Sequence, residues 1–402
     1  MYPILEGLRI VEASAFVAAP TGGLTLAQLG ADVIRVDPIG GGVDAKRWPL
    51  AESGASIYWA SLNKCKRSIT VNLRAPEGRE LVAELVAQSD GGGGCFLTNL
   101  PARGALTYEA LAARRSDVVM VQITGHRDGS TALDYTVNSA VGFPMVTGPA
   151  RPDAPVNHLF PAWDVLTGLT AATGILAAVR RRDATGEGEH ITLALSDIGY
   201  AMVGNLGYIG EAVVNGTERA PTGNDLYGAF GRDFGTRDGR RVMIAAITLR
   251  QWKSLLDAID GHEAMRHIEA MLDVDLSDEG QRFEARDVIS PVVSRWVGAR
   301  GYDEVRVAFD AAGVCWGPYQ SFLEMVRDDP RCSTENPLFE EVDQPGIGRF
   351  MMPGSPLEFR RHERAAVRPA PLLGQHTDEI LAEVLGLGSA KIGELREGGI
   401  VA

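Results

Sequence analysis

Short apolar runs alternate with amphipathic stretches through the first half of the chain. Residues 8–14 (LRIVEAS) predict a buried strand, residues 22–31 (GGLTLAQLGA) a helix, and residues 32–37 (DVIRVD) a second strand. A strand, a helix and a second strand in this order form a βαβ unit, which begins a parallel sheet covered by helices. The same alternation continues in further predicted strands at 68–73, 95–99, 118–124 and from 190, with helices at 76–88, around 108–115 and at 165–182. The pattern therefore predicts an α/β fold.

The pattern changes from about residue 225. A hairpin with RDGR at its turn is followed by amphipathic helices at 249–259, 287–300 and 302–313, which together predict a smaller α+β domain. The tail is rich in proline and glycine and ends in a helix beginning at Thr377. We expect a large domain over 1–200, a linker over 201–224, the small domain over 225–325, and a linker and C-terminal part over 326–402 that returns to the large domain.

Composition narrows the partners. The chain has 402 residues, 45% hydrophobic and 23% charged, with a formal net charge of -13 and no dense basic cluster, so we expect no nucleic-acid partner. Uninterrupted apolar runs are shorter than the ~18 residues of a membrane span, and the first residues lack a signal-peptide pattern. We expect a cytoplasmic protein without a membrane partner. The four cysteines show no CxxC spacing, so no metal site is expected.

Asp164 begins a stretch of almost entirely apolar or small residues (DVLTGLTAATGILAAV). One interpretation is a helix N-cap, because aspartate readily accepts hydrogen bonds from first-turn amides. The other is a nucleophile, which must be ionised and which the positive end of a helix would keep ionised. The spacing alone favours the cap, and Asp134 is a competing carboxylate. His126, in GHRDG after the strand at 118–124, lies where functional loops occur, yet its neighbours make no catalytic triad by themselves.

Four segments in order resemble the family III CoA transferases over nearly the whole chain. They are LEGLRIVEASAFVAAPTGGLTLAQLGADVIRVDPIGGG, SLNKCKRSITVNLRAPEGRELVAELV, GILAAVRRRDATGEGEHITLALSD and PLLGQHTDEIL. By position in the family pattern, Asp164 falls on the aspartate nucleophile, and Asp134 on a nearby acidic position that is not the nucleophile.

The resemblance implies a Rossmann-like large domain built from both ends of the chain, a smaller α+β domain, and a homodimer of two interlocked rings. It also implies an acyl-CoA substrate and no cofactor beyond coenzyme A. His126, Asp134 and Trp163 are expected near the substrate, and Leu159 and Phe160 are expected to help Trp163 exclude water. The residues expected to contact CoA are Phe16, Val17, Ala18, Asn63, Lys66, Arg67, Asn99 and Arg103.

Within this family, segments such as DPIGGG, TNLPARG and YGAFGRDF most resemble a member that moves CoA between two carboxyl groups of one molecule. An aspartyl anhydride and an aspartyl thioester are the implied intermediates. Transfer between an acyl-CoA and a separate acid is the main alternative. A racemase would need a second base, and the related racemases have histidine where this chain has Leu133. A CoA-binding regulatory protein is the non-enzymatic alternative.

Overall fold

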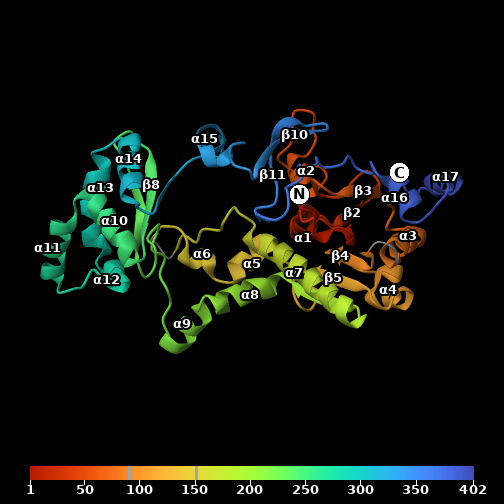
Figure 1. Ribbon diagram of the computed structural model, residues 1–402. Helices are drawn as coiled ribbons and strands as arrows, with labels where there is room; N and C mark the ends of the chain where they lie inside the picture. Colours follow the sequence, from red (N-terminus) through yellow and green to blue (C-terminus); the bar gives the residue numbers. More distant parts are fainter. Residues whose placement is uncertain (89–91, 150–152) are drawn as a thin grey trace. The chain divides into compact units, whose positions relative to one another are not determined.

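The computed structural model describes residues 1–88, 92–149 and 153–402 (Figure 1). The chain divides into two compact units. Unit 1 combines Met1–Val141, His158–Gly216 and Pro330–Ala402, whereas unit 2 combines Gly142–Asn157 and Thr217–Asp329. Each unit has its own hydrophobic core.

A parallel six-stranded sheet forms the centre of unit 1, in the order β3-β2-β1-β4-β5-β6. The predicted α/β fold with a parallel sheet is therefore confirmed. Strand order reverses between β1 and β4, and in such sheets ligands bind beside the carboxyl ends of the strands at the reversal. The strands are β1 (Arg9–Ala13), β2 (Asp32–Asp37), β3 (Arg67–Thr70), β4 (Cys95–Thr98), β5 (Val119–Thr124) and β6 (Glu189–Ala194).

Helices cover both faces of this sheet, which explains why its central strands are almost continuously apolar (Figure 1). One face packs against α3 (Pro76–Ala87), α4 (Tyr108–Arg114), α16 (Thr377–Glu383) and α17 (Ser389–Glu397). The other packs against α1 (Ala18–Gln28) and α7 (Ala162–Thr185). The remaining elements of unit 1 are α2 (Ile57–Asn63), α5 (Asp134–Ala140), α8 (Leu195–Asn205), α9 (Tyr208–Asn215), β10 (Phe339–Gln344) and β11 (Gly348–Pro353), with the short 3-10 helices Pro3–Leu5, Gly104–Leu106 and Pro330–Cys332.

Helices α1 and α7 approach each other closely because glycines face the contact. A Cβ atom on Gly168 would lie 2.5 Å from the carbonyl oxygen of Ala18, and one on Gly22 would lie 3.0 Å from the carbonyl oxygen of Gly168. By length and composition, α7 is also apolar enough to cross a membrane: its mean hydropathy is 1.4, although glycines and threonines interrupt its apolar residues. In unit 1 its Ala171 and Ile175 are buried in the hydrophobic core.

Unit 2 contains the predicted hairpin, formed by β7 (Phe230–Gly235) and β8 (Arg241–Ala246). A third strand, β9 (Trp316–Pro318), pairs with β8 and was not predicted, because three residues are too few to show a periodic pattern. Helices pack against this sheet and one another. The helices of unit 2 are α6 (Phe143–Val146), α10 (Leu249–Ile259), α11 (His262–Leu272), α12 (Glu279–Glu284), α13 (Arg286–Gly298), α14 (Tyr302–Ala312) and α15 (Phe322–Asp328).

The C-terminal segment lies against the β3 edge of the large sheet. The backbone N–H of His376 donates to the carbonyl oxygen of Ser68 at 2.9 Å, and the Thr70 hydroxyl donates to the carbonyl oxygen of Ala402 at 2.9 Å. Val71 and Val401 form an isolated antiparallel bridge. Residues 376–402 therefore complete unit 1 rather than extend from it.

Candidate active site

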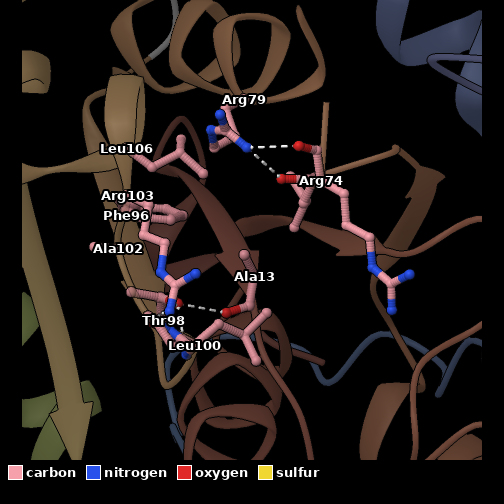
Figure 2. Close-up of a pocket in the computed structure, with 11 residues that line it drawn as sticks. Ala13, Arg74, Arg79, Phe96, Thr98, Leu100, Ala102, Arg103 and Leu106 are labelled. Carbon is pink, nitrogen blue, oxygen red and sulfur yellow. Dashed lines mark hydrogen bonds between the residues drawn. The ribbon is translucent and has the colours of Figure 1, made fainter. Parts of the chain in front are cut away.

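A cavity of about 460 Å³ opens at the carboxyl ends of β1 and β4, where the strand order reverses (Figure 2). Its walls are apolar where Ala13 and Phe96 contribute, and three arginines line it: Arg74, Arg79 and Arg103. Arg79 donates to the carbonyl oxygens of Leu73 and Arg74, which holds this part of the loop in place. Arg74 and Arg103 are exposed, and their guanidinium groups make no ion pair with any residue that the structure describes. The cavity therefore suits a partly apolar ligand that has anionic groups.

The turn between β1 and α1 borders this cavity and is fixed from two sides. The Asn99 side chain accepts from the backbone N–H of Ala15 at 2.9 Å and donates to the Ala15 carbonyl at 2.7 Å. Phe16 has a left-handed backbone, with φ of 64°, and its N–H donates to Asp44 at 3.1 Å. A left-handed conformation is costly for a bulky residue and is maintained only where surrounding contacts enforce it, which is common at functional sites.

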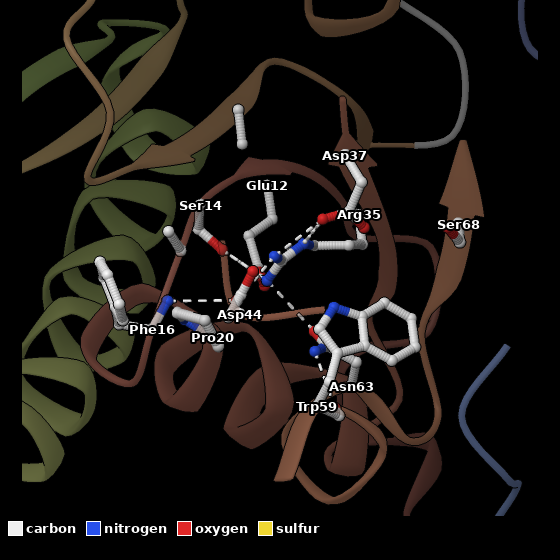
Figure 3. A network of polar contacts seen from close by, with 12 residues as sticks. Glu12, Ser14, Phe16, Pro20, Arg35, Asp37, Asp44, Trp59, Asn63 and Ser68 are labelled. Atoms are coloured by element: carbon white, nitrogen blue, oxygen red, sulfur yellow. Dashed lines mark hydrogen bonds and ion pairs between the residues drawn. The ribbon is translucent and has the colours of Figure 1, made fainter. Parts of the chain in front are cut away.

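A fully buried ionic network underlies the turn (Figure 3). The Arg35 guanidinium pairs with Glu12 at 3.2 Å, Asp37 at 2.9 Å and Asp44 at 3.1 Å. Burial would lower the pKa of Arg35, but these three carboxylates raise it, so the arginine stays charged. Because Asp44 also accepts from Phe16, the network anchors the turn to the sheet.

Asp164 lies in the first turn of α7, but it does not cap that helix. The N-cap position is Pro161, which provides no side-chain acceptor. Instead, Asp134 of α5 accepts from the backbone N–H of Trp163 at 2.7 Å and of Asp164 at 3.1 Å, both with Oδ2. The prediction that Asp164 is the cap is therefore wrong: a carboxylate 30 residues earlier occupies the first-turn amides.

Asp134 is itself buried and held in place. Its Oδ1 lies 2.9 Å from Nε2 of His158, and the indole N–H of Trp163 donates to Asn138 of the same short helix at 3.1 Å. These contacts join the start of α7 to α5. Asp164 is thereby left in the first turn with its carboxylate free of the helix amides.

Burial raises the pKa of Asp164 to about 6, and the nearby charge of Asp134 adds to the shift, while Arg47 opposes it. The sequence had suggested that the helix end would favour the ionised form. The direction is opposite because burial and the Asp134 charge both disfavour the ionised form, while the first-turn amides donate to Asp134 instead. The result is a carboxylate that is largely ionised at neutral pH yet more basic than an ordinary aspartate, which is the combination needed by a nucleophile.

Residues 5–377 match the family model described as CoA-transferase family III. The chain belongs to CoA-transferase family III. It is 52% identical to the 2-methylfumaryl-CoA isomerase of Chloroflexus aurantiacus, over 100% of this chain and 98% of that protein. It is 29% identical to the succinyl-CoA:glutarate CoA-transferase of Homo sapiens, over 99% of this chain and 90% of that protein. A crystal structure of a CAIB/BAIF family protein from Brucella suis superimposes with a TM-score of 0.77 at 25% identity, covering 96% of this chain and 100% of that one.

Family III membership makes this chain an enzyme with an acyl-CoA substrate, and the cavity beside β1 and β4 is its candidate CoA site. Phe16 is exposed in the turn after β1, whereas Val17 and Ala18 are buried at the start of α1. Asn99 holds the turn, and Arg103 lines the cavity. Sequence reasoning missed Arg74 and Arg79. Their place in the sequence could have indicated them, because both follow the carboxyl end of β3 closely, and ligands bind at the carboxyl ends of parallel strands.

Other residues that the family resemblance suggested for CoA are engaged inside unit 1. The buried ammonium of Lys66 donates to Glu12 at 2.9 Å, to the carbonyl oxygen of Pro20 at 2.9 Å and to Asn63 at 3.0 Å. Burial lowers its pKa to about 8 despite the Glu12 carboxylate. Arg67 pairs with Asp32 at 2.6 Å and also contacts α16. Their assignment to the CoA phosphates stays a prediction, and in this structure they stabilise the sheet edge.

His126 shapes its own loop. Its backbone N–H donates to the carbonyl oxygen of Ser130 at 3.0 Å, and its backbone carbonyl accepts from the N–H of Gly129 at 3.0 Å. No contact with Asp164 is found within the described part of the chain. Leu159 and Phe160 are 82% and 63% exposed, so they do not cover Asp164 within a single chain. In residues 1–88, 92–149 and 153–402, no group of three His, Cys, Asp or Glu is arranged to hold a metal ion.

Proposed function

We propose that this enzyme moves CoA between the C1 and C4 carboxyl groups of 2-methylfumarate, with Asp164 as the nucleophile. The reaction interconverts 2-methylfumaryl-CoA and 3-methylfumaryl-CoA. The 52% identity over the whole chain to the 2-methylfumaryl-CoA isomerase of Chloroflexus aurantiacus supports the choice of substrate. The observation that supports the nucleophile is the partly buried Asp164 carboxylate, which has a raised pKa and lies outside the hydrogen bonds of its own helix.

The reaction proceeds through two anhydrides. Asp164 attacks the C1 thioester carbonyl, the carbon–sulfur bond breaks, and CoA leaves as a thiolate. The thiolate attacks the aspartyl carbonyl, giving an aspartyl-CoA thioester and the free diacid. The C4 carboxylate of that diacid then attacks the aspartyl carbonyl and releases the thiolate, which attacks C4 and restores Asp164. Atoms and charge balance without an external proton.

The basicity of Asp164 matters for the first step. A thiolate, with an ordinary pKa of about 8.5, must be displaced by a carboxylate whose ordinary pKa is about 4, so anhydride formation is uphill. A pKa of about 6 reduces that difference while keeping Asp164 ionised at neutral pH. The Trp163 and Asp164 amides already donate to Asp134. We therefore assign stabilisation of the developing oxyanions to the start of α1, where Val17 supplies no side-chain cap to compete for the amides.

We place the nucleotide and phosphates of CoA in the 460 Å³ cavity, with Arg74, Arg79 and Arg103 facing its anionic groups. The thioester would then reach Asp164 past the turn at Phe16.

We also propose a cytoplasmic homodimer of the interlocked type. In support, α9 and the residue that follows α8 expose large apolar side chains that a second copy would cover: Leu206, Ile209, Val213 and Val214.

The test is to incubate 2-methylfumaryl-CoA with labelled free 2-methylfumarate. We expect 3-methylfumaryl-CoA to form without label, because the released acid is retained. Label in the product would replace this proposal with transfer between separate molecules.

Asp164→Ala should abolish turnover while CoA still binds, and hydroxylamine should trap acyl enzyme at Asp164 and not at Asp134. Racemisation is disfavoured because Leu133 offers no base and His126 makes no contact with Asp164 within the described residues.

A further inference from the structure

Arg47, in the loop after β2, is held by aromatic rings. Its guanidinium carbon lies 5.5 Å from the centroid of the Phe16 ring and 5.4 Å from that of Tyr58. The guanidinium makes no hydrogen bond or ion pair with any residue in 1–88, 92–149 or 153–402. Only the backbone of Arg47 is engaged: its N–H donates to the carbonyl oxygen of Asp44 at 3.1 Å, and its carbonyl accepts from the Ser56 hydroxyl at 2.6 Å. Its donors therefore stay available although the side chain is oriented.

The same arginine lies close enough to the nucleophile for their charges to interact. Besides the effect of burial, the charge of Arg47 lowers the pKa of both Asp164 and Tyr58, whereas the charge of Asp164 raises the pKa of Tyr58. The three side chains therefore share one region. Arg47 and Asp164 form no ion pair within 4 Å. The guanidinium is therefore not used to neutralise the nucleophile, whose pKa stays raised.

Tyr58 adds a second unused donor. Its hydroxyl is buried and makes no hydrogen bond with the residues that the structure describes. Burial raises the pKa of Tyr58 to about 12, so the hydroxyl keeps its proton at any working pH. Buried polar atoms nearly always have partners, and one that lacks them beside a nucleophile calls for a ligand.

We propose that Arg47, assisted by the Tyr58 hydroxyl, binds the second, non-reacting carboxylate of a dicarboxylic acyl group while Asp164 attacks the thioester. A guanidinium matches a carboxylate through two parallel N–H donors, and the Phe16 and Tyr58 rings restrict its plane. The inference rests on the proposed function for the identity of the acid. It adds the residues that select a diacid over a monoacid. It also gives the released diacid a contact that holds it between the two halves of the reaction.

A matched pair of thioesters tests this inference. In 2-methylbut-2-enoyl-CoA a methyl group replaces the free carboxylate of 2-methylfumaryl-CoA on the same carbon skeleton. Acylation of Asp164 is followed in the first turnover as the hydroxylamine-sensitive adduct at this residue. We expect Arg47→Met to lower kcat/KM for the diacid thioester roughly 10- to 100-fold, as for loss of a hydrogen-bonded charge pair. For the monoacid thioester the change should stay within about threefold, since no such pair is lost. Tyr58→Phe should show the same selectivity with a smaller loss.

Lys46→Met is the matched control, because it removes an exposed positive charge from the adjacent position of the same loop. It should leave both thioesters unchanged, and circular dichroism should confirm that every variant folds. Equal losses for the two thioesters in Arg47→Met would overturn the inference and assign Arg47 to CoA or to the turn. The two proposals fail separately. If the wild type does not isomerise 2-methylfumaryl-CoA but Arg47→Met still erases selectivity for the diacid, only the proposed function falls.

Discussion

Replacing Asp164 with asparagine should stabilise the protein while abolishing turnover. The folded chain raises the pKa of Asp164 from its ordinary 3.8 to about 6, so the folded state binds this proton more tightly than the unfolded state does. Stability from this carboxyl is therefore greatest below pH 4 and is lost as the pH rises through 6. Above that pH the wild type keeps an unfavourable charge that asparagine lacks.

The size of the effect follows from the shift. A difference of about two pKa units corresponds to about 3 kcal/mol at ~1.4 kcal/mol per unit. Asp164 is only partly buried, so solvent screening reduces this upper value, and we expect about 1–2 kcal/mol at pH 8. For a domain of this size that is a rise in Tm of about 2–4 °C.

Urea and thermal unfolding of wild type and Asp164→Asn at pH 8 and pH 5 would measure this effect. The advantage of the variant should shrink at the lower pH, where the wild-type carboxyl becomes protonated in the folded state. Asp183→Asn is the control, because Asp183 is an exposed carboxylate on the same helix, and its effect should stay within about 0.5 kcal/mol. An Asp164→Asn variant that is no more stable than wild type at pH 8, or whose advantage does not change with pH, would refute the reasoning.

Three further results are expected. Asp134→Asn removes a charge that raises the pKa of Asp164 and weakens the α7 cap, so the acid limb of the pH–rate profile should move to lower pH, with about 1–2 kcal/mol lost in urea unfolding. Arg103→Met should raise KM for every acyl-CoA about 10-fold at unchanged kcat, and added salt should narrow the difference. Gly168→Ala forces a methyl group against an α1 carbonyl and should cost about 1–3 kcal/mol and lower kcat, whereas Gly174→Ala, which has ordinary contacts on the same helix, should not destabilise.

The sequence predicted the large sheet well because its strands are long apolar runs bounded by helices with one apolar side. The predicted strand at 32–37 agrees with β2 residue for residue, and that at 118–124 differs from β5 by one residue. Strand β9 lacked such a pattern. The α/β assignment therefore needed only local periodicity and the usual order of strands and helices.

The site was less accessible because its contacts join distant residues. Asp164 in the first turn matched the preferences of an N-cap, but capping rules consider only the three or four residues that follow. They give no sign that Asp134 would reach the same amides from another helix. Likewise, the spacing of Lys66 could not show that Glu12, 54 residues earlier, would bind its ammonium. The role proposed for Arg47 depends on the rings of Phe16 and Tyr58, which lie far from it in sequence and contact it only in the folded chain.

The return of the C-terminal segment to the β3 edge affects the order in which the chain folds during synthesis. Ile380, Leu381 and Val401 are fully or almost fully buried in the core on one face of the large sheet. Since these residues are translated after unit 2, the part of that face which they cover stays exposed while unit 2 is being made, although all six strands come earlier in the chain. Most of unit 2, Thr217–Asp329, is continuous in sequence and does not have to wait. We therefore expect unit 1, which contains Asp164, to depend more than unit 2 on chaperones that prevent aggregation until the chain leaves the ribosome.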